Sequence, residues 1–392
     1  MTPETRRTAL VLTGGGARAA YQVGVLKAVA ELLPGPAAIP FGIVCGASAG
    51  AINATALACY AARFGEGVRR LEAVWSRLTS DQIYQTDLWG MTLNSLRWIA
   101  TLFRPKTLPP SRRALMDNAP LRRLLARLLR LDRIRTALAK GHLHALSVTC
   151  SGYNSGESVS FFEGHPDIAA WTRSRRMGAR SRIRLDHLMA SSAIPLLFPA
   201  VKIHREYFGD GSMRFLAPIS PALHLGADRV MIIGVADGDP KRTSVGRRNY
   251  PTIAEIGGHV LDSVFIDSLS SDLERLQRIN RTLGRMPEAV RTGMQMELKP
   301  IETLVISPSQ DLAALSGKHA HALPPVVRFF FHRIGITRRT GSAILSYLLF
   351  ESGYTRELIA LGYADALRQK DEILAFFAPA PSAPERLAPG HP

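Results

Sequence analysis

Two units of the form strand, glycine turn and helix follow one another within the first sixty residues. The apolar segment 7–12 runs directly into a glycine turn at 14–16, and a helical pattern of apolar residues follows. The apolar segment 41–45 then enters a second glycine turn and an alanine-rich helix over 51–62. Repeated units of this kind place strands side by side in a parallel sheet that helices cover. We therefore predict an α/β fold with a mainly parallel central sheet.

The second turn contains a serine between two glycines, in the order Gly46, Ser48 and Gly50. A serine on a tight turn between a strand and a helix exposes its hydroxyl, and the flanking glycines let neighbouring backbone approach closely. The following helix directs its N-terminal N–H groups at negative charge that develops nearby. The five-residue pattern alone is common, and its place between a strand and a helix makes it more specific. We predict that Ser48 is the nucleophile of a serine hydrolase acting on acyl esters; the alternative is a packed turn serine.

The first turn consists of Gly14, Gly15 and Gly16, whose N–H groups can form an oxyanion hole or cradle a phosphate. A dinucleotide site needs an acidic residue about 20 residues further on, at the end of the second strand. The segment 40–48 contains no Asp or Glu, and no Gly-Lys-Ser/Thr follows the turn as a phosphate-binding loop requires. By elimination, and because Ser48 is near, we interpret this turn as an oxyanion hole.

A serine nucleophile needs a proton acceptor within hydrogen-bond reach. The eleven histidines are scattered along the chain, and four of them are possible bases: His187, His204, His224 and His259. Asp210 is the better candidate because it follows an apolar strand and lies between two glycines, although an Asp-Gly pair alone is usually only a turn. We predict that Asp210 is partly buried, which raises the pKa of its carboxyl above about 4, and that it lies within hydrogen-bond distance of the serine.

The ordered motifs resemble those of the patatin-like phospholipases. That family carries G-G-G-x-R-G, then G-x-S-x-G, then D-G-G or D-G-A, and the segments 14–19, 46–50 and 210–212 follow this order. The proline-containing stretch 190–199 is similar to the family's segment between the serine and the aspartate. The resemblance covers about residues 7–235.

The resemblance implies a three-layer α/β/α fold and a catalytic dyad in which Ser48 attacks an ester carbonyl and Asp210 takes its proton. It implies hydrolysis of fatty acyl chains from phospholipids or other lipids, with neither metal nor cofactor. The supporting motif residues are Gly14, Gly15 and Gly16 for the oxyanion hole, with Arg18, Gly46, Gly50 and Gly211. Ala19 and Ser212 depart from the family pattern without removing a catalytic group, and the methyl of Ala19 can alter substrate access or rate.

We expect a catalytic domain over 7–310, with a basic helical insertion at about 88–140. A C-terminal helical extension over 311–377 looks like one found in some bacterial members, and we expect a disordered tail over 378–392. The basic stretch 173–184 contains six arginines and no acidic residue, which predicts an exposed loop.

The formal net charge of +17 favours an anionic partner, either nucleic acid or an acidic membrane surface. No nucleic-acid recognition motif is present, so we expect no nucleic-acid partner. Basic residues surround a leucine stripe over 121–129, which indicates docking on anionic lipid or, equally, packing of the stripe on the core. The segment 326–331 is a second possible contact surface, with core burial the simpler interpretation.

No apolar run approaches the roughly 18 residues that a membrane-spanning helix needs, and the N-terminal segment does not develop into a signal peptide. We expect a cytoplasmic protein, with peripheral binding to the inner face of the membrane. Cys45, Cys59 and Cys150 are expected to be buried and reduced. Two alternatives to the dyad hydrolase remain: a catalytically weak lipid-binding protein with the same fold, and an esterase with a Ser-His-Asp triad.

Overall fold

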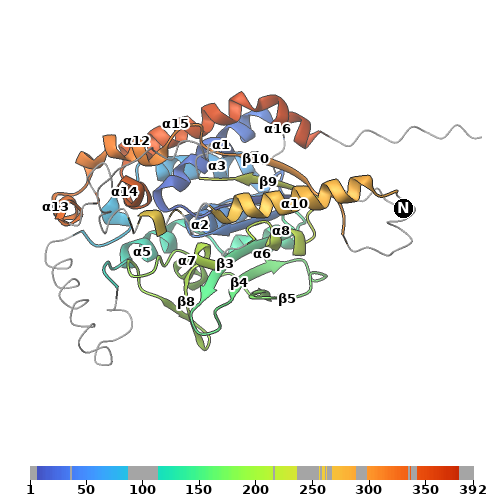
Figure 1. Ribbon diagram of the computed structural model, residues 1–392, viewed down its shortest axis with the longest axis horizontal. Coiled ribbons are helices and arrows are strands. Elements are labelled where there is room, and N and C mark those ends of the chain that lie inside the picture. The colour runs from blue at the N-terminus through green and yellow to red at the C-terminus, as the bar shows by residue number, and fades with distance from the viewer. Residues whose placement is uncertain are drawn as a thin grey trace, which may run out of the picture.

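A central sheet organises the molecule (Figure 1). The computed structural model describes residues 7–35, 38–86, 114–214, 217–235, 256, 258–260, 262, 267–287, 298–333, 336 and 342–378. Within these residues the main strand order is β10-β9-β1-β2-β3-β4-β6-β5, and β7 pairs with β8, which pairs with β3. The strands are β1 (Thr8–Leu12), β2 (Ile43–Ala47), β3 (Ala145–Gly152), β4 (Ser158–Gly164), β5 (Trp171–Arg173), β6 (Arg176–Arg180), β7 (Val201–Ile203), β8 (Glu206–Asp210), β9 (Arg229–Ile233) and β10 (Glu302–Ile306).

Helices cover both sides of this sheet. The principal ones are α1 (Ala20–Leu32), α2 (Ala49–Cys59), α3 (Phe64–Trp75), α5 (Ala119–Leu128), α6 (Asp132–Ala139), α7 (Leu185–Ser191), α8 (Ser220–His224), α10 (Asp267–Arg285), α12 (Leu312–Lys318), α13 (Pro325–Arg333), α14 (Ser342–Leu348), α15 (Ser352–Arg368) and α16 (Lys370–Phe377). A short 3-10 turn, η1 (Gly16–Ala19), precedes α1. In the described part of the chain, no helix combines the length and the apolar character needed to cross a bilayer.

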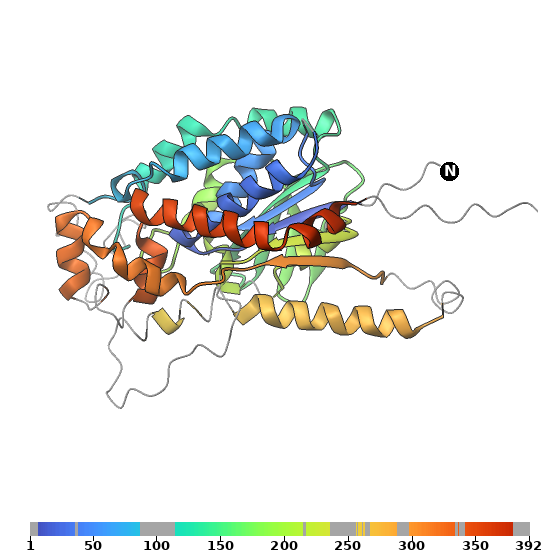
Figure 2. The ribbon, with the colours of Figure 1, turned by 90° about the horizontal axis from the view of Figure 1, so that it is seen from above.

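The five strands β10, β9, β1, β2 and β3 run parallel to one another, while β4 and β8 are antiparallel to β3. Side chains alternate along the central strand β1. Leu10 and Leu12 belong to the larger core with α1, α2, α3, α5 and α15, whereas Ala9 and Val11 belong to a second core with α8 and α10. Figure 2 shows the sheet between these two helical layers. The predicted three-layer α/β/α fold with a mainly parallel sheet is confirmed.

The C-terminal helix α15 packs against α1 with the two backbones in direct contact. A Cβ at Gly24 would collide with the carbonyl of Ile359, and a Cβ at Gly362 would collide with the carbonyl of Tyr21. The Tyr21 hydroxyl also donates a hydrogen bond to Asp365, with 3.0 Å between the oxygens. The helices of the C-terminal segment therefore share the hydrophobic core of the sheet, while the domain boundary at 310/311 stays a prediction.

The basic stretch 173–184 is not simply the exposed loop that its composition predicted. Residues 176–180 form β6, which pairs parallel to β4, and the indole of Trp171 covers Gly178. The arginines remain largely at the surface, while Gly178 and Ile183 turn inward and the backbone gains sheet hydrogen bonds. The composition of the stretch correctly indicated that its arginines are exposed. Pairing with β4 determined that part of its backbone is a strand.

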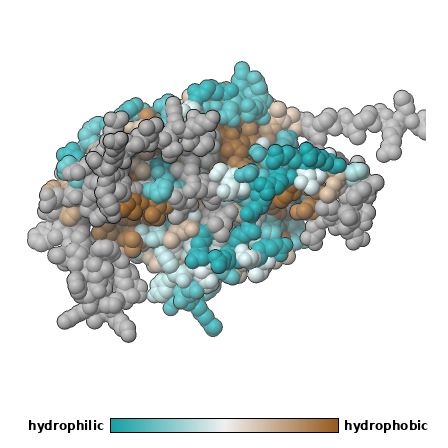
Figure 3. Space-filling model, viewed as in Figure 1, coloured by the Kyte–Doolittle hydropathy of each residue, from teal (hydrophilic) through white to brown (hydrophobic). Residues whose placement is uncertain are grey.

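Two other predicted segments are described only in part. Of the insertion at 88–140, the described portion from 114 onward contains α5 and α6, and 87–113 lies outside the described residues, as does the tail from 379. In α13, Val327 and Phe331 are buried while Phe329 is exposed. On the face seen in Figure 3, hydrophilic side chains cover the outer side of α10 and separate a few apolar patches.

Candidate active site

The register of β3 brings two distant chain segments together. Ala47, the last residue of β2, pairs with Thr149, and Asp210, the last residue of β8, pairs with the next residue, Cys150. β2 runs parallel to β3 and β8 runs antiparallel to it, so both strands end at the same point on β3. Ser48 follows Ala47 directly and therefore lies beside Asp210.

The Ser48 hydroxyl donates a hydrogen bond to Oδ2 of Asp210, with 2.6 Å between the two oxygens. Oδ1 of Asp210 accepts the N–H of Ser212 at 2.9 Å, and the Asp210 N–H donates to the carbonyl of Ala193. Burial raises the pKa of the Asp210 carboxyl to about 6, although the hydrogen bonds from Ser48 and Ser212 oppose that rise. The predicted contact is present, and Asp210 is fully buried where partial burial was expected.

Ser48 has a backbone conformation that is unusual for a residue other than glycine, with φ 53° and ψ −131°. Strain of this kind costs about 1–3 kcal/mol and persists only when the surroundings hold it. Here the Ser48 N–H donates to Oγ of Ser191 at 2.9 Å, and the Ser191 hydroxyl donates to the carbonyl of Thr149 at 2.6 Å. Ser191 thus ties the strained serine to β3. No local sequence pattern singles out this residue, although it lies within the proline-containing stretch.

The motif glycines allow close backbone packing around Ser48. A Cβ at Gly46 would meet the backbone of Gly50, and a Cβ at Gly50 would meet the carbonyls of Leu12 and Thr13. A Cβ at Gly211 would meet the carbonyl of Thr149. Each glycine is required because β1, β2, β3 and the start of α2 converge at this point without space for a side chain.

The first glycine turn lies next to the second. Gly16 has φ +55° and faces the carbonyl of Tyr347, while Gly15 faces the side chain of Val235. Gly16 lines the same cavity as Ser48, whereas Gly14 and Gly15 are not among the described residues that line it. Of the three predicted oxyanion-hole residues, Gly16 is therefore the one in the cavity wall.

Arg18 is buried behind this turn and binds the C-terminal helix α14. Its Nε donates to the Ser346 hydroxyl at 2.7 Å, and its Nη1 donates to the Tyr347 hydroxyl at 3.2 Å. Its Nη2 lies 3.4 Å from a carboxylate oxygen of Asp262, and its guanidinium stacks 4.0 Å from the centre of the Tyr347 ring. Arg18 thus fastens the glycine turn to a helix more than 300 residues away, and no local sequence signal indicates these partners.

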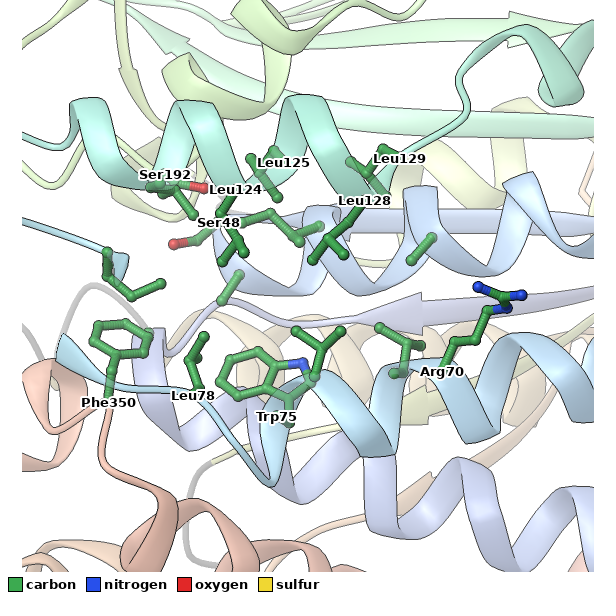
Figure 4. Close-up of a pocket in the computed structure, with 18 of the residues that line it drawn as sticks. Ser48, Arg70, Trp75, Leu78, Leu124, Leu125, Leu128, Leu129, Ser192 and Phe350 are labelled. Atoms are coloured by element: carbon green, nitrogen blue, oxygen red, sulfur yellow. The ribbon is translucent and has the colours of Figure 1, made fainter. Parts of the chain in front are cut away.

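An apolar cavity of about 270 Å³ begins at Ser48. It runs between α3 and α5 along α2, and Figure 4 shows Ser48 and Ser192 at one end and Arg70 at the other. Leucines of α5 and the chain just after it form one wall, and Trp75, Leu78 and Phe350 lie on the opposite side. The leucine wall consists of Leu121, Leu124, Leu125, Leu128 and Leu129. The leucine stripe of 121–129 therefore faces this cavity and the core, although Leu128 is also 41% exposed.

None of the four histidines considered as bases hydrogen-bonds to Ser48 in the described structure. His187 is buried against Phe161, and its Nδ1 accepts the N–H of Arg184 at 3.0 Å. Burial lowers the pKa of the His187 imidazole to about 4. Its Nε2 has no hydrogen-bond partner among the described residues.

The three buried cysteines are free thiols, as expected. Burial raises the pKa of Cys150, which lies beside Asp210 in the sheet, and the Asp210 carboxylate adds to that rise. A thiol with a raised pKa is a poor nucleophile, because the thiolate is the reactive form. Cys150 is therefore poorly suited to act as a nucleophile.

Comparison with known proteins gives one family and several remote structural similarities. A search of curated proteins finds no match. Among solved structures, VipD from Legionella pneumophila is 14% identical, with a TM-score of 0.35. The comparison covers 94% of this chain and 67% of the VipD chain. Human GIVD cytosolic phospholipase A2, in complex with methyl gamma-linolenyl fluorophosphonate, is 15% identical with a TM-score of 0.42. That comparison covers 95% of this chain, which spans only 59% of the human protein.

The family comparison covers the site just described. The model for patatin-like phospholipase matches residues 10–223, more than half of the chain. The matched region includes both glycine turns, Ser48 and Asp210, and it ends before β9 and the C-terminal helices. The chain belongs to the patatin-like phospholipase family.

Proposed function

We propose that this protein is a serine acyl hydrolase that cleaves fatty acyl ester bonds of phospholipids or related lipids. The observation that carries the proposal is the 2.6 Å hydrogen bond from Ser48 to Asp210 at the head of an apolar cavity. A nucleophile, a base and an apolar channel then occur in one place, as hydrolysis of an acyl ester requires.

In the proposed reaction, Ser48 Oγ attacks the ester carbonyl carbon while its proton passes to Oδ2 of Asp210. The tetrahedral intermediate collapses, the carbon–oxygen bond to the alcohol breaks, and Asp210 returns the proton to the departing alkoxide. Water then attacks the acyl-enzyme, giving its proton to Asp210, and the fatty acid and Ser48 are released as that proton returns to Oγ. Burial of Asp210 supports this role, because a carboxyl with a pKa of about 6 accepts a proton far better than an exposed one.

Negative charge on the carbonyl oxygen needs hydrogen-bond donors. Within the described residues, the N–H groups of Gly16 and Ala49 make no hydrogen bond to other protein groups, and both residues line the cavity with Ser48. Ala49 is also the first residue of α2, where N–H groups and the helix dipole favour negative charge. We assign the oxyanion hole to the N–H groups of Gly16 and Ala49, with Gly14 and Gly15 supporting the conformation of Gly16.

The cavity suits an acyl chain. It has a volume of about 270 Å³ and runs from Ser48 toward Arg70. Leucine, isoleucine, alanine and aromatic side chains form most of its wall, so each methylene that enters contributes about 0.8 kcal/mol. The acyl chain would extend from Ser48 toward Arg70 while the alcohol part of the lipid stays outside.

The outer face of α5 and α6 supports binding to an anionic membrane surface. Seven basic side chains are exposed there beside the leucine wall of the cavity: Arg122, Arg123, Arg127, Arg130, Arg133, Arg135 and Lys140. Arg122 pairs with Asp186 at 2.7 Å and Arg130 with Asp132 at 3.8 Å, which leaves five of the seven basic side chains outside these two pairs. We propose that this basic face binds anionic lipid and so brings the substrate to the cavity as the protein docks peripherally.

The proposed function is tested by measuring fatty acid release from phospholipid vesicles and from soluble acyl esters. Wild type is expected to release fatty acid, and Ser48→Ala and Asp210→Asn are expected to abolish it. Asp167→Asn, which changes an exposed aspartate outside both the cavity and the basic face, is the matched control and should retain activity. Full activity in Asp210→Asn together with loss in a histidine variant would favour a Ser-His-Asp esterase. Vesicle binding without any release would favour a lipid-binding protein.

A further inference from the structure

One buried hydroxyl beside the nucleophile has no hydrogen-bond partner. Ser192 is 8% exposed, and its Oγ makes no hydrogen bond within the described structure. A buried polar group without a partner costs about 1–3 kcal/mol. Five other side chains of the described structure also bury an unpartnered polar atom, but of these six groups Ser192 is the one that lines the cavity.

Ser192 lies on a segment that holds both members of the proposed dyad. On one side of it, the Ser191 hydroxyl accepts the N–H of Ser48 at 2.9 Å. On the other side, the carbonyl of Ala193 accepts the N–H of Asp210 at 2.9 Å. The position of Ser192 relative to both groups is therefore constrained, as accurate contact with a reacting atom requires.

The side chain of Ser192 lines the cavity at the end where Ser48 lies (Figure 4). The rest of the wall is mostly apolar, and an acyl chain offers it only methylene groups. The carbonyl oxygen is the one polar atom of the acyl group, and it must lie within a few ångströms of Ser48 during attack. A hydroxyl in this part of the wall consequently has the carbonyl oxygen as its natural acceptor.

A further observation concerns the hydrogen-bond donors that are available to the developing oxyanion. The N–H of Ser48 is already used, because it donates to Ser191. The nucleophile's own N–H is then unable to stabilise the developing oxyanion, which leaves that task to the glycine turn, the start of α2 and any side-chain donor nearby. We propose that the Ser192 hydroxyl donates a hydrogen bond to the carbonyl oxygen of the acyl ester bound at Ser48. This inference rests on the proposed acyl hydrolase function.

Ser147 provides a matched control for Ser192. Ser147 on β3 is fully buried, its Oγ has no partner among the described residues, and it is not one of the residues lining the cavity. Ser192→Ala and Ser147→Ala each remove an unpartnered buried hydroxyl, so neither is expected to lower the free energy of unfolding. A purely structural role for Ser192 would instead appear as destabilisation in Ser192→Ala.

The test compares steady-state hydrolysis of an oxygen ester and a thioester that share the same acyl chain. We expect Ser192→Ala to lower kcat/KM on the order of 100-fold on both substrates, because both have the carbonyl oxygen. The loss should lie mainly in kcat, as for a contact that strengthens in the transition state. Ser147→Ala should leave kcat/KM unchanged, and Ser192→Thr, which keeps a hydroxyl, should recover part of the activity. Undiminished activity in Ser192→Ala, or an equal loss in Ser147→Ala, overturns the inference, and a loss confined to the oxygen ester overturns the carbonyl contact.

A second measurement separates failure of this inference from failure of the proposed function. Covalent labelling of Ser48 by an alkyl fluorophosphonate, followed by mass spectrometry, needs no turnover of an ester and places a phosphoryl oxygen where the carbonyl oxygen would lie. We expect Ser192→Ala to slow labelling by a factor similar to its loss in kcat/KM. If wild type hydrolyses no ester but this slowing persists, the proposed function fails and the Ser192 contact stands. An equal labelling rate in wild type and Ser192→Ala overturns the contact.

Discussion

Ser48 and Asp210 are 162 positions apart in sequence and share a 2.6 Å hydrogen bond, because β2 and β8 end at adjacent residues of β3. The contact therefore depends on strand register and not on a flexible loop. A shift of β8 by one residue would turn the carboxylate to the opposite face of the sheet. This geometry leads to several measurable consequences.

The first concerns the pH dependence of activity. A protonated Asp210 cannot accept the Ser48 proton, so kcat/KM should fall as the pH drops through about 6, the raised pKa of its carboxyl. A steady-state profile between pH 4 and 9 on a soluble ester measures this. If His187 were the base, its lowered pKa would place the midpoint near 4 instead.

The second concerns the stability of Asp210→Asn. The folded-state pKa of Asp210 is raised above the usual value of 3.8, so the folded protein binds the proton more tightly than the unfolded chain does. Proton binding by this carboxyl therefore stabilises the folded state at low pH, and this stabilisation is lost as the pH rises through about 6. At higher pH the buried carboxylate carries an unfavourable charge. Asp210→Asn should be inactive yet raise the free energy of unfolding by about 3 kcal/mol at pH 8. Urea unfolding at pH 8 and below pH 4 checks this, since the difference should vanish in acid.

The third concerns the acyl chain. Each methylene that enters the cavity should raise kcat/KM about fourfold, from about 0.8 kcal/mol per group, until the cavity is full. Ala56 lines the cavity on α2, and Ala56→Phe should fill part of it. The variant should lose activity on palmitate esters and keep it on butyrate esters, which do not reach so far. An equal loss on both chain lengths would show that the substitution had damaged the fold instead.

The fourth concerns the link from Arg18 to α14. Lysine cannot reproduce the contacts that the guanidinium makes with Ser346 and Tyr347, so Arg18→Lys should misplace Gly16. We expect kcat to fall on the order of 100-fold with little change in KM, because positioning is lost and the cavity is not. Arg229→Lys is the control, since Arg229 forms a two-pronged pair with Glu302 at distances of 2.7 and 3.1 Å outside the site. That variant should lose stability and keep its kcat.

The fifth concerns membrane binding. Arg123→Glu with Arg127→Glu reverses two exposed charges on α5 and should weaken binding to vesicles containing phosphatidylglycerol, while activity on soluble esters stays near wild type. Arg275→Glu with Arg281→Glu makes the same charge change on α10, on the opposite side of the sheet (Figure 2). Cosedimentation at low and high salt measures both. Equal weakening by the two double variants would indicate a response to net charge and not to this face.

The leucine stripe of α5 illustrates the limit of a pattern. The sequence predicted an amphipathic helix there and left open whether its apolar face met lipid or the core. Helical periodicity identifies which side chains share a face, and it contains no information on what that face contacts. In the structure, Leu121 and Leu125 are buried, and the stripe also forms a wall of the cavity that starts at Ser48.

The sequence by itself determined the α/β architecture, the two glycine turns, and Ser48 and Asp210 as the candidate pair, because strand–turn–helix patterns and turn chemistry are local properties. Only the tertiary structure decided which groups meet. Strand register on β3 joined Asp210 to Ser48 and buried it completely, and packing of α14 supplied the partners of Arg18 from 328 residues away. The unpartnered hydroxyl of Ser192 likewise appeared only in three dimensions, because a missing hydrogen bond is a property of the folded surroundings and not of the residue.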